Sequence, residues 1–322
     1  MNKLLTRWFT LCVVVTCTLS ARVEYAGKGS DNFPIRWAFQ ELCDHHFDPR
    51  WEWETPRIDD KPVTFNPRDV KPGDLIFVRD AGAYFEDIAP KIKVPYFILT
   101  HGEYLDKFEK EHFSYLEDNN VLAWFTLHPC PVRHERVIPI PLGIIQQKEM
   151  HDTKKKQFET FMKLRNREKK KLVYCNFTCW RNPERQKLLD FFKEQPFCTD
   201  SGPCEFKDYI TELSHHKFVL SPPGLGPDCY RVWESLLVGT IPIIEHSHMD
   251  MMYAGLPVLL IDDWKCITPE FLEDRYEEIT SKSYSQEKLT MEYWIARIDA
   301  VRKKYWPTSA GPFRKVTARK IG

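Results

Sequence analysis

Residues 218–264, FVLSPPGLGPDCYRVWESLLVGTIPIIEHSHMDMMYAGLPVLLIDDW, are the stretch that decides the fold. The pattern predicts a strand, a Gly/Pro loop, a short helix, a second strand, another loop and a third strand. In the loop at 221–227, Gly224 and Gly226 carry no side chain, so the backbone there can approach a ligand closely. Parallel α/β sheets bind ligands where their strands end, and the predicted helix begins at such an end.

The short helix of this stretch has start and stop signals. Asp228 is a residue type that caps helix N-termini, and Gly239 stands where the helix should stop. Thr240–Glu245 then reads as a buried parallel strand. One side of the helix is apolar, which predicts that it faces the core: Cys229, Val232, Trp233, Leu236 and Leu237.

The opposite side of the helix carries Arg231 and Glu234. Arg231 falls in the first turn, where free N–H groups and the positive helix end attract anions, and a guanidinium there suits a diphosphate. Glu234 falls one turn deeper, where a carboxylate can accept hydrogen bonds from a ribose diol. The two residues together predict a nucleotide-sugar site. The alternative is a surface Arg–Glu pair, which is common on helices.

Polar and aromatic residues near the loop are further candidates for the donor site. Ser221 and Tyr230 flank the loop and could touch the base or a phosphate of the donor, although packing inside is the favoured role for Tyr230. His246 and His248 follow the strand 240–245 and could contact the sugar or the base.

The motifs of this stretch resemble the C-terminal, donor-binding half of the exostosin-like glycosyltransferases, in the branch that includes the ribitol xylosyltransferase. The matching pieces are FVLSPPG, the D-x-x-R-x-W-E helix, the GTIPI turn into a strand, and LPVLLIDDW. Weaker similarity extends upstream, to YCNFTCWRNPERQKL at 174–188 and to GDLIFVRD and VPYFILTHGEY within 73–104. Together these pieces span most of residues 70–300.

The resemblance implies a fold, a stereochemistry and one more site residue. It implies an α/β protein with two Rossmann-like domains facing across a cleft, the GT-B arrangement, and transfer with inversion. It also implies that Arg185, near the start of a predicted helix, is a second diphosphate contact; a solvent-facing Arg185 is the alternative. The donor-binding set is then Arg231, Glu234, Arg185, Ser221, Gly224, Gly226, Asp228 and Tyr230.

One absence from the sequence bears on metal use. No two aspartates are separated by a single residue, so the D-x-D motif that holds a cation in metal-dependent GT-A transferases is missing. Helix N–H groups and basic side chains must then stabilise the leaving diphosphate, with Arg231 and Arg185 as candidates. We therefore expect no metal site, no cofactor and metal-independent donor binding.

An inverting transfer needs a general base for the proton of the acceptor hydroxyl. His101 and Glu103 directly follow the predicted strand YFILT, and Asp106 lies just beyond them; Asp80 ends the preceding strand. His101 and Glu103 are the preferred candidates, and the sequence does not single out one base. Capping of the next helix is the alternative role for these residues.

Length and patterning predict two α/β domains. The chain has 322 residues, and strands at 75–78, 96–100, 121–127 and 137–140 alternate with helices, the first at 34–46. The predicted parts are an acceptor-side domain at 30–150, a charged linker at 151–170, a nucleotide-sugar-binding domain at 171–284, and a helix at 285–307 that packs back on the first domain. The 46 basic and 46 acidic residues cancel, which argues against nucleic acid as a partner.

The N-terminus predicts export. Met1–Ala21 has Lys3 and Arg7, a short apolar run and Ser20-Ala21, a signal-peptide pattern, with an uncleaved signal anchor as the alternative and sole predicted membrane contact. The expected location is the ER or Golgi lumen, the outside of the cell, or a bacterial periplasm. In such compartments disulfides are permitted, and Cys198 and Cys204 are the best local pair, with free thiols as the alternative.

The sequence thus predicts a hexosyl- or pentosyltransferase that moves a sugar from a nucleotide-sugar donor, UDP-linked by expectation, to a glycan or another hydroxyl acceptor. The alternative is an exported carbohydrate-binding protein that kept a GT-B-like fold and lost turnover; retention of Arg231 and Glu234 favours the enzyme. No G-x-S-x-G elbow and no G-x-G-x-x-G after a strand is present, which argues against a hydrolase of that type and a dinucleotide dehydrogenase.

Overall fold

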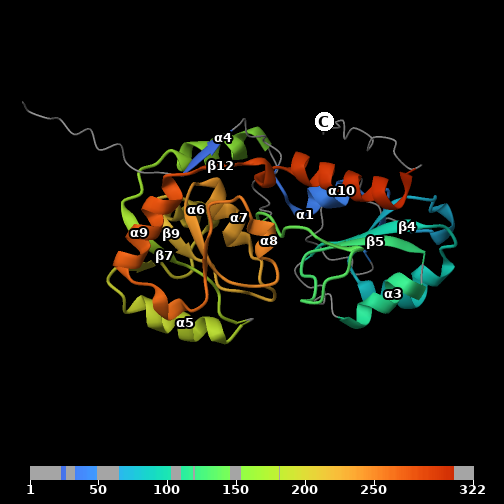
Figure 1. Cartoon of the computed structure of the whole chain (residues 1–322), viewed down its shortest axis with the longest axis horizontal. Helices are drawn as coiled ribbons and strands as arrows, with labels where there is room; N and C mark the ends of the chain where they lie inside the picture. Colours follow the sequence, from blue (N-terminus) through green and yellow to red (C-terminus); the bar gives the residue numbers. More distant parts are fainter. Residues whose placement is uncertain are drawn as a thin grey trace, which may run out of the picture.

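The chain folds into an α/β structure with two parallel sheets of five strands each. The computed structural model describes residues 23–26, 33–48, 65–102, 110–118, 120–145, 154–180 and 182–307. The two sheets lie in separate lobes, with helices packed around each (Figure 1). The predicted α/β fold class is confirmed.

The first sheet has the order β2-β3-β4-β5-β6, and all its neighbours pair in parallel. Its strands are β2 (His45–Phe47), β3 (Leu75–Val78), β4 (Tyr96–Thr100), β5 (Val121–Thr126) and β6 (Val137–Pro139). The described helices of this lobe are α1 (Arg36–Glu41), α2 (Ala81–Ala83) and α3 (Phe113–Asp118). Every residue of β3 and β4 is buried, because both faces of a parallel sheet are covered.

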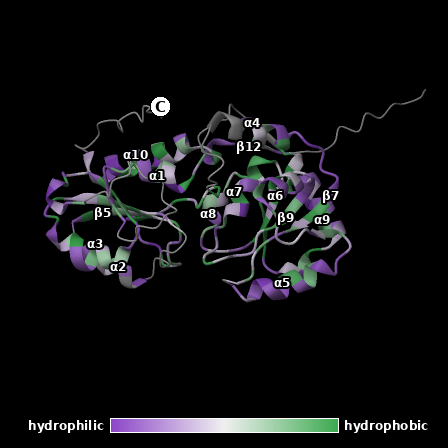
Figure 2. Cartoon of the chain, turned by 180° about the vertical axis from the view of Figure 1, so that it is seen from behind, coloured by the Kyte–Doolittle hydropathy of each residue, from purple (hydrophilic) through white to green (hydrophobic). Residues whose placement is uncertain are grey.

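The second sheet has the order β11-β10-β9-β7-β8 and is also parallel throughout. Its strands are β7 (Lys171–Cys175), β8 (Cys198–Asp200), β9 (His216–Leu220), β10 (Ile241–Glu245) and β11 (Leu259–Ile261). Its helices are α4 (Lys154–Arg165), α5 (Glu184–Lys193), α6 (Phe206–Leu213), α7 (Tyr230–Leu237), α8 (Asp250–Tyr253) and α9 (Pro269–Thr280). Figure 2 shows both hydrophilic and hydrophobic residues along α5, as expected for a helix with one face against a sheet.

Short elements complete the chain. β1 (Glu24–Ala26) pairs in parallel with β12 (Ser283–Ser285), and α10 (Met291–Tyr305) follows. Single 3-10 or π turns lie at Pro67–Asp69, Tyr84–Ile88, Ala89–Lys91, Lys110–His112, Trp264–Cys266 and Glu287–Leu289. None of the helices in the described ranges combines the length and the apolar character that a membrane span requires.

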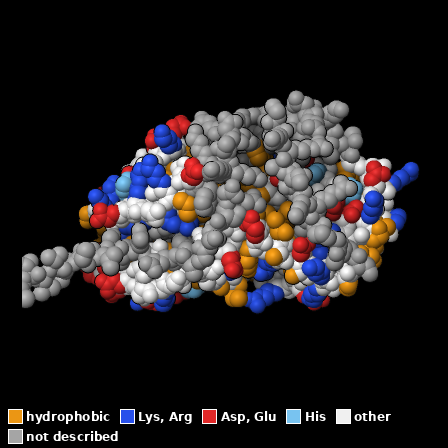
Figure 3. All heavy atoms as spheres, turned by 90° about the horizontal axis from the view of Figure 1, so that it is seen from above, with side chains coloured by type: hydrophobic (Ala, Val, Ile, Leu, Met, Phe, Trp, Pro, Cys, Tyr) orange, Lys and Arg blue, Asp and Glu red, His pale blue; other side chains and the backbone are white. Residues whose placement is uncertain are grey.

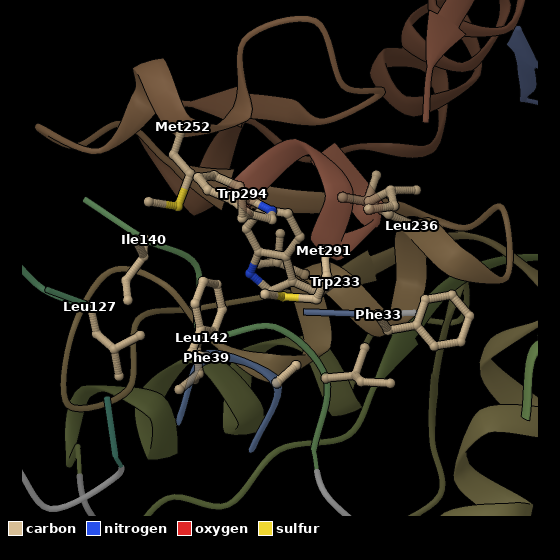
Figure 4. Close-up of a cluster of buried hydrophobic side chains, with 14 of the residues drawn as sticks. Phe33, Phe39, Leu127, Ile140, Leu142, Trp233, Leu236, Met252, Met291 and Trp294 are labelled. Atoms are coloured by element: carbon tan, nitrogen blue, oxygen red, sulfur yellow. The ribbon is translucent and has the colours of Figure 1, made fainter. Parts of the chain in front are cut away.

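A buried apolar cluster joins the two lobes. It takes Phe77 and Phe97 from one face of the first sheet, and Trp233 from α7 in the second lobe. Trp233 meets Trp294 of α10 edge to face, with ring centroids 6.2 Å apart, and Figure 4 shows both beside Met291 and Leu142. Each sheet has a further cluster of its own, so the lobes share one core and keep one each.

Helix α10 runs from this shared core onto the first sheet. Met291 and Trp294 near its start are buried in the cluster. Near its end, Arg302 Nη2 donates to the carbonyl of Gly73 at 2.8 Å, and the Tyr305 hydroxyl donates to the carbonyl of Glu135 at 3.1 Å. The last described helix therefore ties the second lobe to the first.

Two local predictions need correction. The helix predicted at 34–46 ends at Glu41, and His45 starts an edge strand, because Asp74 bonds to the His45 ring at 2.8 Å and fixes the segment beside β3. The segment 151–170, predicted as a charged helical linker with few core positions, contains the helix α4 as expected, but it buries Phe161 and Leu164 against the second lobe. Its Arg165 Nε donates to the carbonyl of Leu237 at the end of α7, at 2.8 Å.

Candidate functional site

The loop at 221–229 lies at the carboxyl end of β9, between β10 and β7 in the second sheet. The N–H of Ser221 donates to Ile243 of β10 at 3.0 Å, and within the loop the N–H of Gly224 donates to Gly226 at 3.0 Å. Helix α7 then begins at Tyr230. The loop and the helix start therefore occupy the edge at which parallel sheets bind ligands.

Helix α7 ends where the sequence predicted, but the residue that caps its start is not the predicted one. The helix stops at Leu237, and Gly239 has φ +72°, a left-handed conformation that suits glycine, so the predicted stop is confirmed. At the start, the residue in the N-cap position is Cys229, with φ −145° and no side-chain cap. The prediction that Asp228 caps the helix is wrong.

Asp228 instead links the two lobes. Its Oδ2 accepts from the backbone N–H of Leu142 in the first lobe at 2.7 Å, and its Oδ1 accepts from the Tyr253 hydroxyl at 3.0 Å. The Trp233 indole N–H lies 2.9 and 3.0 Å from the two carboxylate oxygens. Burial raises the pKa of Asp228 to about 6. Because both carboxylate oxygens are bonded to protein groups, the structure gives Asp228 a structural role in place of the predicted contact with the donor.

Glu234 has a similar role one turn further along α7. Its Oε1 accepts from the N–H of Ile145 at 3.1 Å, and its Oε2 accepts from the Tyr209 hydroxyl at 2.9 Å. Only 3% of the residue is exposed, and burial raises the pKa of its carboxyl. Both oxygens thus bind protein groups in the interior. In place of the predicted contact with a ribose, Glu234 makes a contact between the two lobes.

Arg185 holds the Gly/Pro loop in place. Its Nε donates to the carbonyl of Pro223 at 2.9 Å, its Nη2 to that of Pro222 at 2.7 Å, and its Nη1 to that of Thr178 at 3.0 Å. The residue is 8% exposed. Each nitrogen of this buried guanidinium thus donates to a backbone carbonyl, three of its five N–H groups in all, so the structure gives Arg185 the role of a clamp on the loop in place of the predicted diphosphate contact.

The two loop glycines make room for protein rather than for a ligand. A Cβ on Gly224 would lie 3.1 Å from Arg185 Nη2. A Cβ on Gly226 would lie 2.4 Å from Nδ1 of His128, a residue of the first lobe just after β5. The close approach predicted at these glycines is present, but the groups approached are the Arg185 clamp and the His128 ring.

Arg231 stands apart from these occupied groups. Its guanidinium carbon lies 5.5 Å from the centre of the Phe177 ring, and the clamped Arg185 lies 5.6 Å from the same ring. Among the described residues, Arg231 makes no hydrogen bond and no ion pair, and its buried Nε has no partner. The Arg231 charge acts on the Glu234 carboxyl without forming an ion pair, so this half-buried guanidinium, in the first turn of a helix, is available to a ligand anion.

Ser221 and Tyr230, the other two candidates at the loop, have different surroundings. Ser221 is fully buried at the end of β9, and its Oγ has no hydrogen-bond partner in the described part of the chain. A buried hydroxyl without a partner is unusual, so this group is a further candidate for a ligand contact. Tyr230 is half-buried and packs against the shared apolar cluster, which favours the packing alternative.

The candidate bases lie at the end of β4. His101 is 1% exposed, its ring stacks on Phe39 at 5.2 Å, and its Nε2 lies 3.2 Å from the carbonyl of Pro141. Burial lowers the pKa of His101 to about 3. A buried ring that binds protons so weakly is unsuited to take a proton from an acceptor hydroxyl. The structure therefore argues against His101 as the general base. Glu103 and Asp106 lie outside the described residues, and Asp80 caps α2 through Ala83.

Several contacts at this edge had no clear signal in the sequence. Phe177 is the ring that Arg231 faces, and Tyr209 is a partner of Glu234. His128 packs on Gly226, and His248 Nε2 lies 2.7 Å from the carbonyl of Pro129. His128 and Phe177 follow the ends of β5 and β7 in the chain, and that position was the only available indication.

The other sequence candidates have simple surroundings. His246 pairs with Asp250 at 2.6 Å, which raises the pKa of the imidazole. Cys198 and Cys204 are both free thiols. Within the described ranges, no group of three or more His, Cys, Asp or Glu side chains is placed to hold a metal ion.

Comparison with known proteins finds similarity in the C-terminal part of the chain. Residues 155–306 match the family model described as the RXYLT1 C-terminal domain, a range that includes α4 and α10. The ribitol-5-phosphate xylosyltransferase 1 of Mus musculus is 27% identical over 153 residues, covering 37% of this chain and 33% of that protein. That of Danio rerio is 25% identical over 149 residues, covering 38% and 34%.

The predicted resemblance to the ribitol xylosyltransferase branch is thereby confirmed for the C-terminal part of the chain. The chain spans about a third of the length of the curated relatives it matches, since 33% and 34% of those proteins are covered. The solved structure of TarM aligns with a TM-score of 0.31 and 12% identity, over 73% of this chain and 52% of that one.

Proposed function

We propose that this chain is a glycosyltransferase that moves a sugar from a nucleotide-sugar donor, a UDP-sugar, to a hydroxyl of a glycan or another acceptor. The similarity of residues 155–306 to proteins named as xylosyltransferases supports transfer of a sugar in general. We also propose that the enzyme is exostosin-like, that the sugar it transfers is a hexose or a pentose, and that UDP carries this sugar.

The free guanidinium of Arg231 is the observation that carries the proposal. Its neighbours Arg185, Asp228 and Glu234 all have hydrogen-bond partners, whereas Arg231 has a ring on one face and no hydrogen bond or ion pair within the described residues. The Oγ of Ser221, directly after β9, is a second group at this edge for which the described residues offer no hydrogen-bond partner. A diphosphate would satisfy both groups at a helix start that favours negative charge.

In the proposed reaction the acceptor oxygen attacks the anomeric carbon of the donor. The new carbon–oxygen bond forms as the bond to the diphosphate breaks, and the acceptor proton passes to a base while the nucleoside diphosphate leaves. Arg231 and the N–H groups of α7 stabilise the negative charge on the leaving group, so we propose that no metal is needed. We further propose inversion, with Glu103 or Asp106, near the end of β4, as the base.

The arrangement of the lobes supports a GT-B type of active site between them. The segment after β5 touches the loops after β9 and β10, through His128 with Gly226 and through Pro129 with His248. The carboxyl ends of both sheets therefore meet, which is where we propose that donor and acceptor bind. We also propose export to the secretory pathway, with Met1–Ala21 as signal peptide or anchor.

Thermal denaturation with UDP, GDP and buffer, each with and without EDTA, tests the proposal. A ligand that binds the folded state stabilises it by RT ln(1 + [L]/Kd), so the melting temperature rises with the affinity and the concentration of the ligand. We expect UDP to raise it with EDTA present, and Arg231→Ala to remove most of that rise. Arg275→Ala removes a half-buried arginine of α9, which pairs with Glu278, and serves as the control. No shift with either nucleotide in the parent protein would contradict the donor site.

A further inference from the structure

One carboxylate at the carboxyl edge of the second sheet has no partner among the described residues. Glu245, the last residue of β10, is half-buried and makes no hydrogen bond or ion pair with any of them. The other described acidic side chains between β7 and α9 that are at least partly buried all bind protein groups: Glu212, Asp228, Glu234 and Asp250. A partly buried charge without a partner is unfavourable, so Glu245 is a candidate for a ligand contact.

The register of the sheet directs Glu245 to the same face as Phe177. Val173 of β7 and Ile241 of β10 both pair with Phe218 of β9, and all three side chains lie in one buried cluster on one face of the sheet. Phe177 and Glu245 each follow four residues further along, and side chains alternate between the faces with a period of two. Phe177 belongs to the same cluster, in agreement with this register. Only β9 separates the two strands, so their axes lie about 10 Å apart.

This edge connects the proposed anion site with the first lobe. At the end of β7, the guanidinium carbon of Arg231 lies 5.5 Å from the centre of the Phe177 ring. At the end of β10, His248 follows Glu245 by three residues, and its Nε2 lies 2.7 Å from the carbonyl of Pro129 in the first lobe. A donor whose diphosphate is held by Arg231 can extend across the end of β9 to Glu245. Its sugar would then lie next to the lobe that is proposed to hold the acceptor.

We infer that Glu245 binds hydroxyl groups of the sugar that the donor carries. This inference rests on the proposed function and deepens it, because it names the side chain that recognises the transferred sugar. An ionised carboxylate only accepts hydrogen bonds, through two oxygens, and its bonds are stronger than those of a neutral acceptor. Two neighbouring hydroxyls of a sugar ring can each donate to one of these oxygens.

The charges at this edge favour a sugar hydroxyl over the other groups that Glu245 could meet. A carboxylate repels a diphosphate, for which Arg231 offers a cation instead. A metal ion needs several ligands, and Glu245 belongs to no group of three or more acidic, His or Cys side chains within the described ranges. A hydroxyl is a neutral donor and suits a single carboxylate. A site that hydrogen-bonds a hydroxyl strongly rejects a sugar that lacks it, so Glu245 would determine which sugars bind.

Isothermal titration calorimetry on the full chain, with EDTA and without an acceptor, tests the inference. The probes are UDP, UDP-glucose and UDP-xylose. We expect Glu245→Ala to weaken the binding of at least one UDP-sugar by about tenfold or more, and to leave UDP affinity unchanged. Glu245→Gln keeps the shape of the side chain and one acceptor oxygen, so it should weaken the same UDP-sugar less. Glu212→Gln is the control, because Glu212 is half-buried and pairs with Lys171 at the opposite end of β7.

The UDP titrations separate this inference from the proposed function. If UDP binds the parent and both Glu245 variants equally, and only the UDP-sugar is weakened, the inference is supported. If Glu245→Ala binds both UDP-sugars as the parent does, or loses UDP and UDP-sugars to the same extent, the inference is wrong and the proposed donor site is retained. A Mn²⁺-dependent gain in UDP affinity that Glu245→Ala abolishes would also overturn it, because the carboxylate would then hold a cation. No binding of UDP to the parent would overturn the proposed function and this inference with it.

Discussion

At the scale of single residues, four charged side chains near the start of α7 divide by what they bind. Asp228 and Glu234 bind backbone N–H groups of the first lobe, and Arg185 binds carbonyls of the Gly/Pro loop. Arg231 makes no ion pair within the described part of the chain, and its guanidinium lies 5.5 Å from the centre of the Phe177 ring. Three of these groups thus build the site, and the fourth is left for the ligand.

Phe177 should position Arg231 for an anion. Replacing its ring in Phe177→Leu removes a cation–π contact of about 0.5–2 kcal/mol, so UDP affinity should fall about 2- to 30-fold. Phe177→Tyr keeps an aromatic face and should restore most of the affinity. Isothermal titration calorimetry of both variants checks this. Equal UDP affinity in Phe177→Leu and the parent would show that the ring does not orient the guanidinium.

Asp228 should make the stability of the protein depend on pH. Its pKa in the fold is about 6, above the value of about 3.9 in an unfolded chain, so the folded state holds the proton more tightly. The contribution of this group to the unfolding free energy is therefore greatest below pH 4 and falls as pH rises from about 4 to 6.

Urea denaturation from pH 4 to 7 measures this contribution. Asp228→Asn should lose that component, so its unfolding free energy should vary less with pH than that of the parent. At pH 7 the variant should be less stable by about 1–3 kcal/mol, because an amide NH₂ cannot accept the hydrogen bonds that an oxygen accepts. Parallel pH curves for the two proteins would refute the assignment.

At the scale of elements, α7 shows how far the sequence can be read. Its apolar side, its stop at Gly239 and the strand that follows were all predictable, because these signals are local. The roles of Asp228 and Glu234 were not, because their partners Leu142 and Ile145 lie 86 and 89 residues away in the chain. Buried strands such as LIFV and YFILT were found for the same local reason.

Gly239 should be costly to replace. Its φ of +72° is unfavourable for other residues, and a Cβ there would lie 3.3 Å from Cγ of Arg165. Gly239→Ala should lower the unfolding free energy by about 1–2 kcal/mol, as judged by urea denaturation. Gly202→Ala is the matched control, with φ +61° and no atom within 4 Å of a Cβ, and should cost less. Equal losses would show that packing on Arg165 is unimportant.

At the scale of the whole molecule, the two lobes are held together by a shared core and by contacts at their strand ends. The cluster around Trp233 and Trp294 lies between the sheets, and Gly226 packs on His128 beside it. Charges of both signs are interspersed on the described part of the face in Figure 3, in keeping with the balanced composition. This arrangement was not predictable in detail, because cross-lobe packing leaves no periodic pattern in the sequence.

The contact between Gly226 and His128 should couple the lobes. Gly226→Ala would place a methyl group 2.4 Å from the His128 ring and should lower the unfolding free energy by about 1–3 kcal/mol. The second substitution His128→Ala should relieve much of that loss. A double-mutant cycle in urea measures the coupling. Additive effects of the two substitutions would show that the loop does not depend on this contact.

The account as a whole depends on Arg231 holding a diphosphate. Isothermal titration calorimetry of UDP and of uridine into the parent and into Arg231→Ala tests this most directly. A charged hydrogen bond contributes about 1.5–3 kcal/mol, so UDP affinity should fall about 10- to 160-fold in the variant. Uridine, which has no phosphate, should bind the two proteins equally. An unchanged affinity for UDP in Arg231→Ala would contradict the central claim.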